Sequence, residues 1–243
     1  FGLEHIVLTE LVVEHDGGAI PMLQPIAAHF KDGTYRKDLP EEIVKALVVP
    51  GEHSFSRSDL DKLEAYVRTL GAKGLARAKV GEDGKSWVQS PLAKFAPESF
   101  IAAVNDACGA KPGDLILFQF GSTDSVHMIM ANLRLHLGKK LGLIPEFGSG
   151  GKYHFLWVNN PPLFEYDAQT KRYVAAHHMF TQPTQETEAL LETDPAKVLC
   201  HRYDLVLNGF EIGGGSIRLH DRAVQQRVFG VLGIGEEEAQ QKF

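Results

Sequence analysis

The hydrophobic positions in the first half of the chain alternate between strand-like and helix-like spacing. A β-branched run at residues 44–50 predicts a strand that closes in a Pro-Gly turn. After Ser56, apolar residues recur at helical spacing up to Gly71, which predicts a helix with the serine as its N-cap. Three further elements follow the same rules: a strand at 75–80, a helix at 97–105 and a strand at 114–120. This β-α-β-α-β order predicts a compact α+β module of about 100 residues.

Strands dominate the second half of the chain, which a long predicted helix at 125–143 introduces. Four outward residues of this helix form a small basic strip: Arg134, His136, Lys139 and Lys140. We interpret the strip as a solvated helix face in preference to an RNA contact. A Gly-rich hinge follows at 145–151. The remaining predicted elements are strands at 153–158, 172–176, 203–207 and 208–220, with helical connections at 186–192 and 224–233.

The composition narrows the class of protein. Of 243 residues, 44% are hydrophobic and 23% charged, as in soluble globular proteins, and a net charge of −6 argues against nonspecific coating of nucleic acid. Cys108 and Cys200 have no C-x-x-C spacing, so we expect no disulfide framework, no zinc site and a reducing cytoplasm. No apolar run is long enough to predict a membrane helix. Because the chain starts at Phe1 and stops inside a helix-like segment, we expect it to be part of a longer polypeptide.

The strand at 208–220 reads NGFEIGGGSIRLH and contains the main candidate chemistry. Glycine weakens a strand, so its three consecutive glycines suggest that something lies against the bare backbone. Glu211 and Arg218 are seven positions apart and would lie on opposite faces of a regular strand. A bulge at Gly213, Gly214 and Gly215 would turn both toward one concavity, where the acid suits Mg²⁺ and the arginine suits a carboxylate. A tight barrel corner with a surface salt bridge remains an equal alternative.

Other motifs add one histidine to this candidate pocket. His177 and His178 are adjacent, so on a strand at most one of them faces a given pocket, and a lone histidine is more often structural. Glu165 follows tandem prolines and is interpreted as a surface acid. The sequence contains no Walker loop, no G-x-G-x-x-G and no G-x-S-x-G. The residues alone therefore predict a strand-rich pocket for a small anionic ligand, with magnesium as a possible partner.

Residues 203–220, YDLVLNGFEIGGGSIRLH, closely resemble the late catalytic segment of bacterial-type aspartyl-tRNA synthetases, which are class II synthetases. The resemblance continues upstream and downstream over nearly the whole chain. Segments similar to the family's catalytic domain lie at 155–158, 162–165, 177–181, 228–234 and 236–243. Segments similar to its inserted domain lie at 45–51, 71–76, 90–95 and 113–118, and residues 133–143 are similar to its returning helix.

The resemblance implies a role for each candidate residue. Arg218 would grip the side-chain carboxylate of aspartate, and Glu211 would hold Mg²⁺ near the phosphates of ATP. His177 would contact the amino acid, with His178 beside it in the same wall. Gly213, Gly214, Gly215 and Ser216 would form the floor and wall under aspartyl-adenylate. The implied reaction converts aspartate and ATP to aspartyl-adenylate and pyrophosphate and then transfers the aspartyl group to tRNA(Asp), in a cytoplasmic homodimer.

The resemblance also implies a fold and a division of the chain. The fold is α+β: an inserted α+β module, then part of the antiparallel class II sheet with flanking helices. The expected parts are a catalytic lead-in at 1–14, the inserted domain at 15–122, a connecting helix and hinge at 123–150, and a partial catalytic domain at 151–243. Asn160, Pro161 and Met179 depart from the family pattern at the pocket rim. The family's three class-defining motifs and its anticodon-binding barrel lie outside these residues, so the isolated piece is predicted to be inactive.

Two alternatives remain open. A relaxed ligase that charges both aspartate and asparagine tRNAs would share these motifs. A non-catalytic tRNA-binding module, akin to the insert in subunits of tRNA-dependent amidotransferases, would explain 15–122 alone but not the segments around His177 and Arg218. An unrelated anion-binding protein would require every match to arise by chance.

Overall fold

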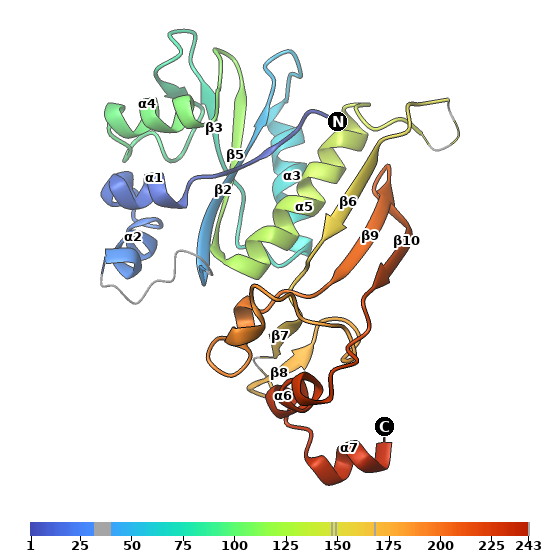
Figure 1. The fold of residues 1–243 in the computed structure, drawn as a ribbon. Coiled ribbons are helices and arrows are strands. Elements are labelled where there is room, and N and C mark those ends of the chain that lie inside the picture. The colour runs from blue at the N-terminus through green and yellow to red at the C-terminus, as the bar shows by residue number, and fades with distance from the viewer. Residues whose placement is uncertain (32–39, 147, 149, 168, 243) are drawn as a thin grey trace. The chain divides into compact units, whose positions relative to one another are not determined.

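The computed structural model describes residues 1–243 except 32–39, 147, 149, 168 and 243, so part of the predicted hinge lies outside the described residues. The chain divides into two compact units, Phe1–Ser149 and Gly150–Phe243 (Figure 1). The strand β1 lies within the predicted lead-in and pairs with β2 of the first unit. The four-part division predicted from the sequence stays a prediction.

A five-stranded antiparallel sheet forms the centre of the first unit, in the order β1-β2-β5-β3-β4. Its strands are β1 (His5–Val7), β2 (Glu42–Val49), β3 (Ala76–Val80), β4 (Trp87–Val88) and β5 (Leu115–Ser122). The central pair β2 and β5 consists mainly of buried residues, because apolar clusters cover both faces of the sheet. The predicted strands at 44–50, 75–80 and 114–120 are confirmed, whereas β1 and β4 were not predicted.

Helices cover both faces of this sheet and make three layers (Figure 1). On one side lie α1 (Thr9–Glu14), a 3₁₀ turn η1 (Asp16–Ala19), α2 (Gln24–Lys31) and α4 (Glu98–Ala107); on the other lie α3 (Arg57–Thr69) and α5 (Thr123–Lys140). Ser56 caps α3 as predicted: its side chain accepts the N–H of Asp59, and the Asp59 carboxylate accepts the N–H of Ser56. These polar contacts satisfy backbone donors that the first helical turn leaves free.

The predicted basic strip on α5 is largely engaged within the first unit. His136 stacks on Tyr66 with ring centroids 4.2 Å apart, and Lys140 pairs with Asp59 at 2.9 Å. Arg134 lies over the ring of Phe1 and donates to a backbone carbonyl of the same N-terminal segment. Lys139 and Lys140 are exposed, as a solvated helix face requires, whereas Arg134 and His136 are half-buried against aromatic rings of other elements.

The second unit contains a three-stranded antiparallel sheet and a separate two-stranded one. Its elements are β6 (Phe155–Asn159), β7 (Phe164–Asp167), β8 (Arg172–Ala175), η2 (Glu188–Leu190), η3 (Pro195–Lys197), β9 (Arg202–Leu207), β10 (Phe210–Ser216), α6 (Arg222–Leu232) and α7 (Glu236–Lys242). The predicted strands are confirmed and β7 is added. The predicted helical connection at 186–192 is a short 3₁₀ helix, η2, and no longer helix forms there, because the Thr187 hydroxyl bonds the backbone of Leu199.

The core of the second unit lies away from its three-stranded sheet. Leu163, Phe164, Val198 and Val228 pack together with Cys200 in this core. By contrast, β6 is exposed along its whole length, with large side chains uncovered on both faces of the sheet. The exposed apolar residues of the sheet are Phe155, Leu156, Trp157, Val158, Tyr203, Phe210 and Ile212. Apolar exposure on this scale is typical of a surface that packs against further protein.

A polar cluster of the buried Lys45, the half-buried His5 and the more exposed His127 joins three elements of the first unit. Lys45 on β2 is buried, and its Nζ lies 2.7 Å from Nδ1 of His127 on α5. Nε2 of His5 on β1 lies 3.0 Å from the carbonyl oxygen of Met130. Burial, followed by the nearby positive charge of Lys45, lowers the pKa of His127. Burial also lowers the pKa values of His5 and Lys45.

This cluster predicts that mild acid destabilises the first unit. A histidine with a lowered folded-state pKa binds its proton more readily in the unfolded chain, so stability falls as pH drops below about 6.5. We expect the thermal midpoint to fall between about pH 7.5 and about pH 5.5 and His127→Gln to weaken this dependence. Differential scanning calorimetry checks both. The exposed His154→Gln is the control, and an unchanged pH dependence in His127→Gln would contradict the assignment.

Candidate functional site

The glycine-rich strand β10 contains the predicted bulge. It pairs with β9 through a two-residue turn in which Asn208 and Gly209 both adopt positive φ, as a tight hairpin requires. The register shifts between Glu211 and Gly213, so Ile212 is the extra residue. The bulge therefore lies immediately before the glycines, not within them. One added residue exchanges the faces on which all later side chains lie.

The shifted register places Glu211 on the same sheet face as two residues of β9. Residues that pair directly across antiparallel strands share a face. Glu211 pairs with Val206, Gly214 pairs with Asp204 and Ser216 pairs with Arg202, and these three β9 positions alternate onto one face. Gly213 and Gly215 lie on the opposite face, where a Cβ on Gly215 would meet the ring of Tyr203. Of the three predicted floor glycines, only Gly214 therefore shares the face of the acid.

Two carboxylates and one guanidinium converge above Gly214. Nη2 of Arg202 lies 3.1 Å from Oδ1 of Asp204 and 4.0 Å from Oε1 of Glu211. A Cβ on Gly214 would overlap the Asp204 carboxylate and lie 3.2 Å from Oε1 of Glu211. The missing side chain thus makes room for both acids. Paired carboxylate oxygens suit Mg²⁺, so the residues fit the cation that the sequence predicted at Glu211.

Asp204 and Arg202 are site candidates that sequence reasoning missed. Both lie on β9, and only the bulged register brings them next to Glu211. The signal in the sequence was the acid at the second position of the motif YDLVLNG, but its face depends on Ile212 being unpaired. Among the residues that the structure describes, no group of three or more His, Cys, Asp and Glu side chains is placed to hold a metal ion.

Arg218 lies against His178 rather than against Glu211. Nη1 of Arg218 is 3.2 Å from Nδ1 of His178, which also accepts the N–H of Phe180. The guanidinium and the backbone N–H can only donate, so Nδ1 is the acceptor in both contacts. If the alternation of β10 is continued beyond Ser216, Arg218 falls on the face of Glu211. In the described structure, however, the guanidinium of Arg218 contacts His178, and the carboxylate of Glu211 lies near Arg202. Arg218 and Glu211 therefore do not form the surface salt bridge of the alternative interpretation.

The two histidines do not lie on a strand, so the strand-based expectation for them is wrong. β8 ends at Ala175, and His177 and His178 lie in the bend that follows. His178, predicted as the neighbour, is the histidine that contacts Arg218. The predicted contact of His177 with a substrate stays a prediction. Glu165 is exposed on β7, as its interpretation as a surface acid requires.

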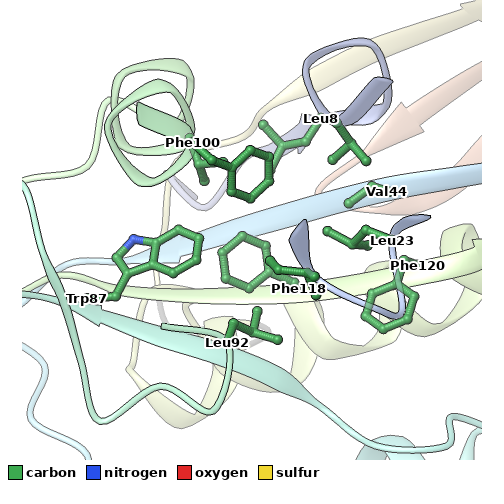
Figure 2. Close-up of a pocket in the computed structure, with 11 residues that line it drawn as sticks. Leu8, Leu23, Val44, Trp87, Leu92, Phe100, Phe118 and Phe120 are labelled. Carbon is green, nitrogen blue, oxygen red and sulfur yellow. The ribbon is translucent and has the colours of Figure 1, made fainter. Parts of the chain in front are cut away.

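Neither described cavity coincides with the carboxylate pair. An apolar cavity of about 20 Å³ lies inside the first unit, between side chains such as Trp87, Phe100 and Phe118 (Figure 2). Without polar partners, it offers a water molecule no hydrogen bonds and is a packing void. A groove of about 400 Å³ in the second unit is lined by Phe180, Arg222 and neighbouring residues of α6 and α7. Phe180 also lies beside His178, so this groove adjoins the histidine that contacts Arg218.

The two cysteine thiols are not part of the candidate site. Burial raises the pKa of Cys108 to about 12 and that of Cys200 to about 11, so neither thiol forms a ready nucleophile.

None of the helices in the described part of the chain combines the length and apolar character that crossing a membrane requires.

Comparison with known proteins identifies both units. The family model of the GAD domain matches residues 37–130. Over all 243 residues the chain is 57% identical to the aspartate–tRNA(Asp/Asn) ligase of Anaeromyxobacter sp. (strain K), of which it covers 38%. The chain belongs to the aspartyl-tRNA synthetase family. An aspartate–tRNA ligase of Macrococcus caseolyticus (strain JCSC5402) is 51% identical over 201 residues, which are 82% of this chain and 33% of that relative.

Membership of the aspartyl-tRNA synthetase family confirms the predicted resemblance and the α+β fold. The GAD domain is the inserted module of these class II enzymes, and its match lies within the first unit. The chain spans about two fifths of the length of the Anaeromyxobacter relatives, as expected for part of a longer polypeptide. The roles of individual site residues stay predictions.

Proposed function

We propose that the complete polypeptide is an aspartate–tRNA ligase. It activates L-aspartate with ATP to aspartyl-adenylate and transfers the aspartyl group to tRNA(Asp). The observation that carries this proposal is the 57% identity, across the whole chain, to proteins named aspartate–tRNA(Asp/Asn) ligase. That match includes the bulged hairpin as well as the inserted domain, which disfavours a stand-alone tRNA-binding module. We further propose a cytoplasmic homodimer as its working form.

Arg218 is proposed to bind the side-chain carboxylate of aspartate. Its guanidinium offers two parallel donors, a geometry that suits a carboxylate and that neutral asparagine cannot satisfy equally. His178 accepts a hydrogen bond from Arg218 and thereby orients its guanidinium. His177 completes the proposed wall around the amino acid.

Glu211 is proposed to hold Mg²⁺ beside the phosphates of ATP, with Asp204 as the second carboxylate. The cation, when bound, neutralises phosphate charge; the protein residues position it and the substrate. The bare backbone at Gly214, with Ser216 on the same sheet face, is proposed as the floor and wall under the adenylate. Catalysis of this kind depends on positioning and electrostatic stabilisation and requires no covalent intermediate with the protein.

Aspartate-dependent exchange of pyrophosphate into ATP tests the proposed function. The complete polypeptide is expected to catalyse the exchange, and glutamate and asparagine are expected to substitute poorly for aspartate. The 243-residue piece alone is expected to show none, because it spans only 38% of its relatives. Exchange by the isolated piece would contradict its predicted inactivity, and no exchange by the complete polypeptide would contradict the proposed function itself.

A relaxed tRNA range is a specific second candidate. Three relatives that match the chain over its full length carry the name aspartate–tRNA(Asp/Asn) ligase, whereas the Macrococcus relative is named only for aspartate. Charging assays with purified tRNA(Asp) and tRNA(Asn) separate the two forms. Aspartate attached to both tRNAs supports the relaxed enzyme, and attachment only to tRNA(Asp) excludes it.

A further inference from the structure

Nη2 of Arg202 approaches both of the carboxylates that would hold a cation. It is 3.1 Å from Asp204 and 4.0 Å from Glu211, and the three side chains share one sheet face. The side chain of Asp204 is 17% exposed, so solvent screens this charge only in part. One positive charge therefore already offsets part of the negative potential that would attract a divalent ion.

The guanidinium of Arg202 is anchored mainly by these acids. Its Nε is buried and has no hydrogen-bond partner in the described structure, so Nη2 makes the described polar contacts. Ser216 lies directly opposite Arg202 in the strand pair. Gly214, the neighbouring position of β10 on the same sheet face, has no side chain that could hold the arginine. A cation that engaged Asp204 and Glu211 would compete directly with the contacts that hold Arg202.

We propose that Arg202 is an internal counter-cation that competes with Mg²⁺ for the Asp204–Glu211 pair. The arginine keeps the two acids close when the metal is absent and raises the Mg²⁺ concentration at which the site fills. This inference rests on the proposed magnesium site and adds a residue that sets its affinity. The charge of Arg202, not its size, carries the effect.

Binding of Mn²⁺ to the complete polypeptide, followed by loss of the free-ion electron paramagnetic resonance signal, tests the proposal. Removing the charge with Arg202→Gln is expected to lower the Mn²⁺ dissociation constant roughly five- to tenfold. Arg202→Lys keeps the charge and is expected to stay near the wild type. The gain in Arg202→Gln is expected to shrink at high salt, because screening weakens the competing charge.

Two further variants separate the possible outcomes. Arg172→Gln removes an exposed arginine of β8 and is expected to leave Mn²⁺ binding unchanged. Adding Glu211→Gln to Arg202→Gln is expected to cancel the gain. Equal or weaker Mn²⁺ binding by Arg202→Gln, with the wild type binding normally, overturns the role of Arg202. Wild-type binding that Glu211→Gln leaves unchanged overturns the proposed magnesium site instead, and circular dichroism identifies any variant that fails to fold.

Discussion

Replacing Arg218 with leucine in the complete enzyme is expected to lower kcat/KM for aspartate about a thousandfold. The substitution leaves the substrate carboxylate without its partner, and leucine keeps only an apolar side chain about as long as the stem of arginine. His178 also loses its contact with the guanidinium, so the wall around the amino acid loses its orientation. Steady-state pyrophosphate exchange at varied aspartate concentration measures the effect.

Controls distinguish this loss from general damage. ATP affinity is expected to stay within about twofold of the wild type, because Arg218 lies with His178 rather than with Glu211. Arg172→Leu removes an exposed arginine from β8 and is expected to leave kcat/KM unchanged. Arg218→Lys restores the charge without the fork and is expected to recover only a small part of the activity. Unaltered aspartate affinity in Arg218→Leu would refute the assigned role.

The elements with strong local signals could be predicted from the sequence. The capping serine and the apolar spacing behind it defined α3 within about two residues, a β-branched run defined β2, and a short apolar run defined β5. The short helices α1 and α2 have no comparable signal, since they contain few residues and take their stability from packing on the sheet. Tertiary contacts, not local propensity, therefore determine α1 and α2.

In the candidate site, too, the positions of single residues depend on tertiary contacts that the sequence pattern does not reveal. The need for a bulge followed from the seven-residue spacing of Glu211 and Arg218, but its position at Ile212 depends on pairing with β9. That pairing decides which residues join the acid, so Asp204 and Arg202 could not be found from period-two alternation alone. The contact of His178 with Arg218 likewise depends on a bend after β8 that the sequence did not predict.

Gly214→Ala is expected to lower kcat/KM of the complete enzyme about a hundredfold, whereas Gly213→Ala, one position earlier, is expected to stay within a few-fold of the wild type. A Cβ on Gly214 would overlap Asp204 and approach Glu211, so at least one carboxylate must move. A Cβ on Gly213 meets nothing within 4 Å, and neither residue has a positive φ that would strain alanine. The two variants therefore differ in where the added methyl group lies, not in backbone conformation.

The Mg²⁺ dependence of the two variants identifies the cause of the loss. If the methyl group displaces the carboxylates, Gly214→Ala needs more Mg²⁺ for half-maximal exchange, while Gly213→Ala keeps the wild-type requirement. Pyrophosphate exchange at varied Mg²⁺ concentration, with thermal unfolding as the folding control, measures this difference. A large loss in both variants with an unchanged Mg²⁺ requirement would mean that the glycines serve a ligand lying on both faces of the strand, and not the acids above Gly214. Equal, near-wild-type activity in both would show that the room above Gly214 has no part in the reaction.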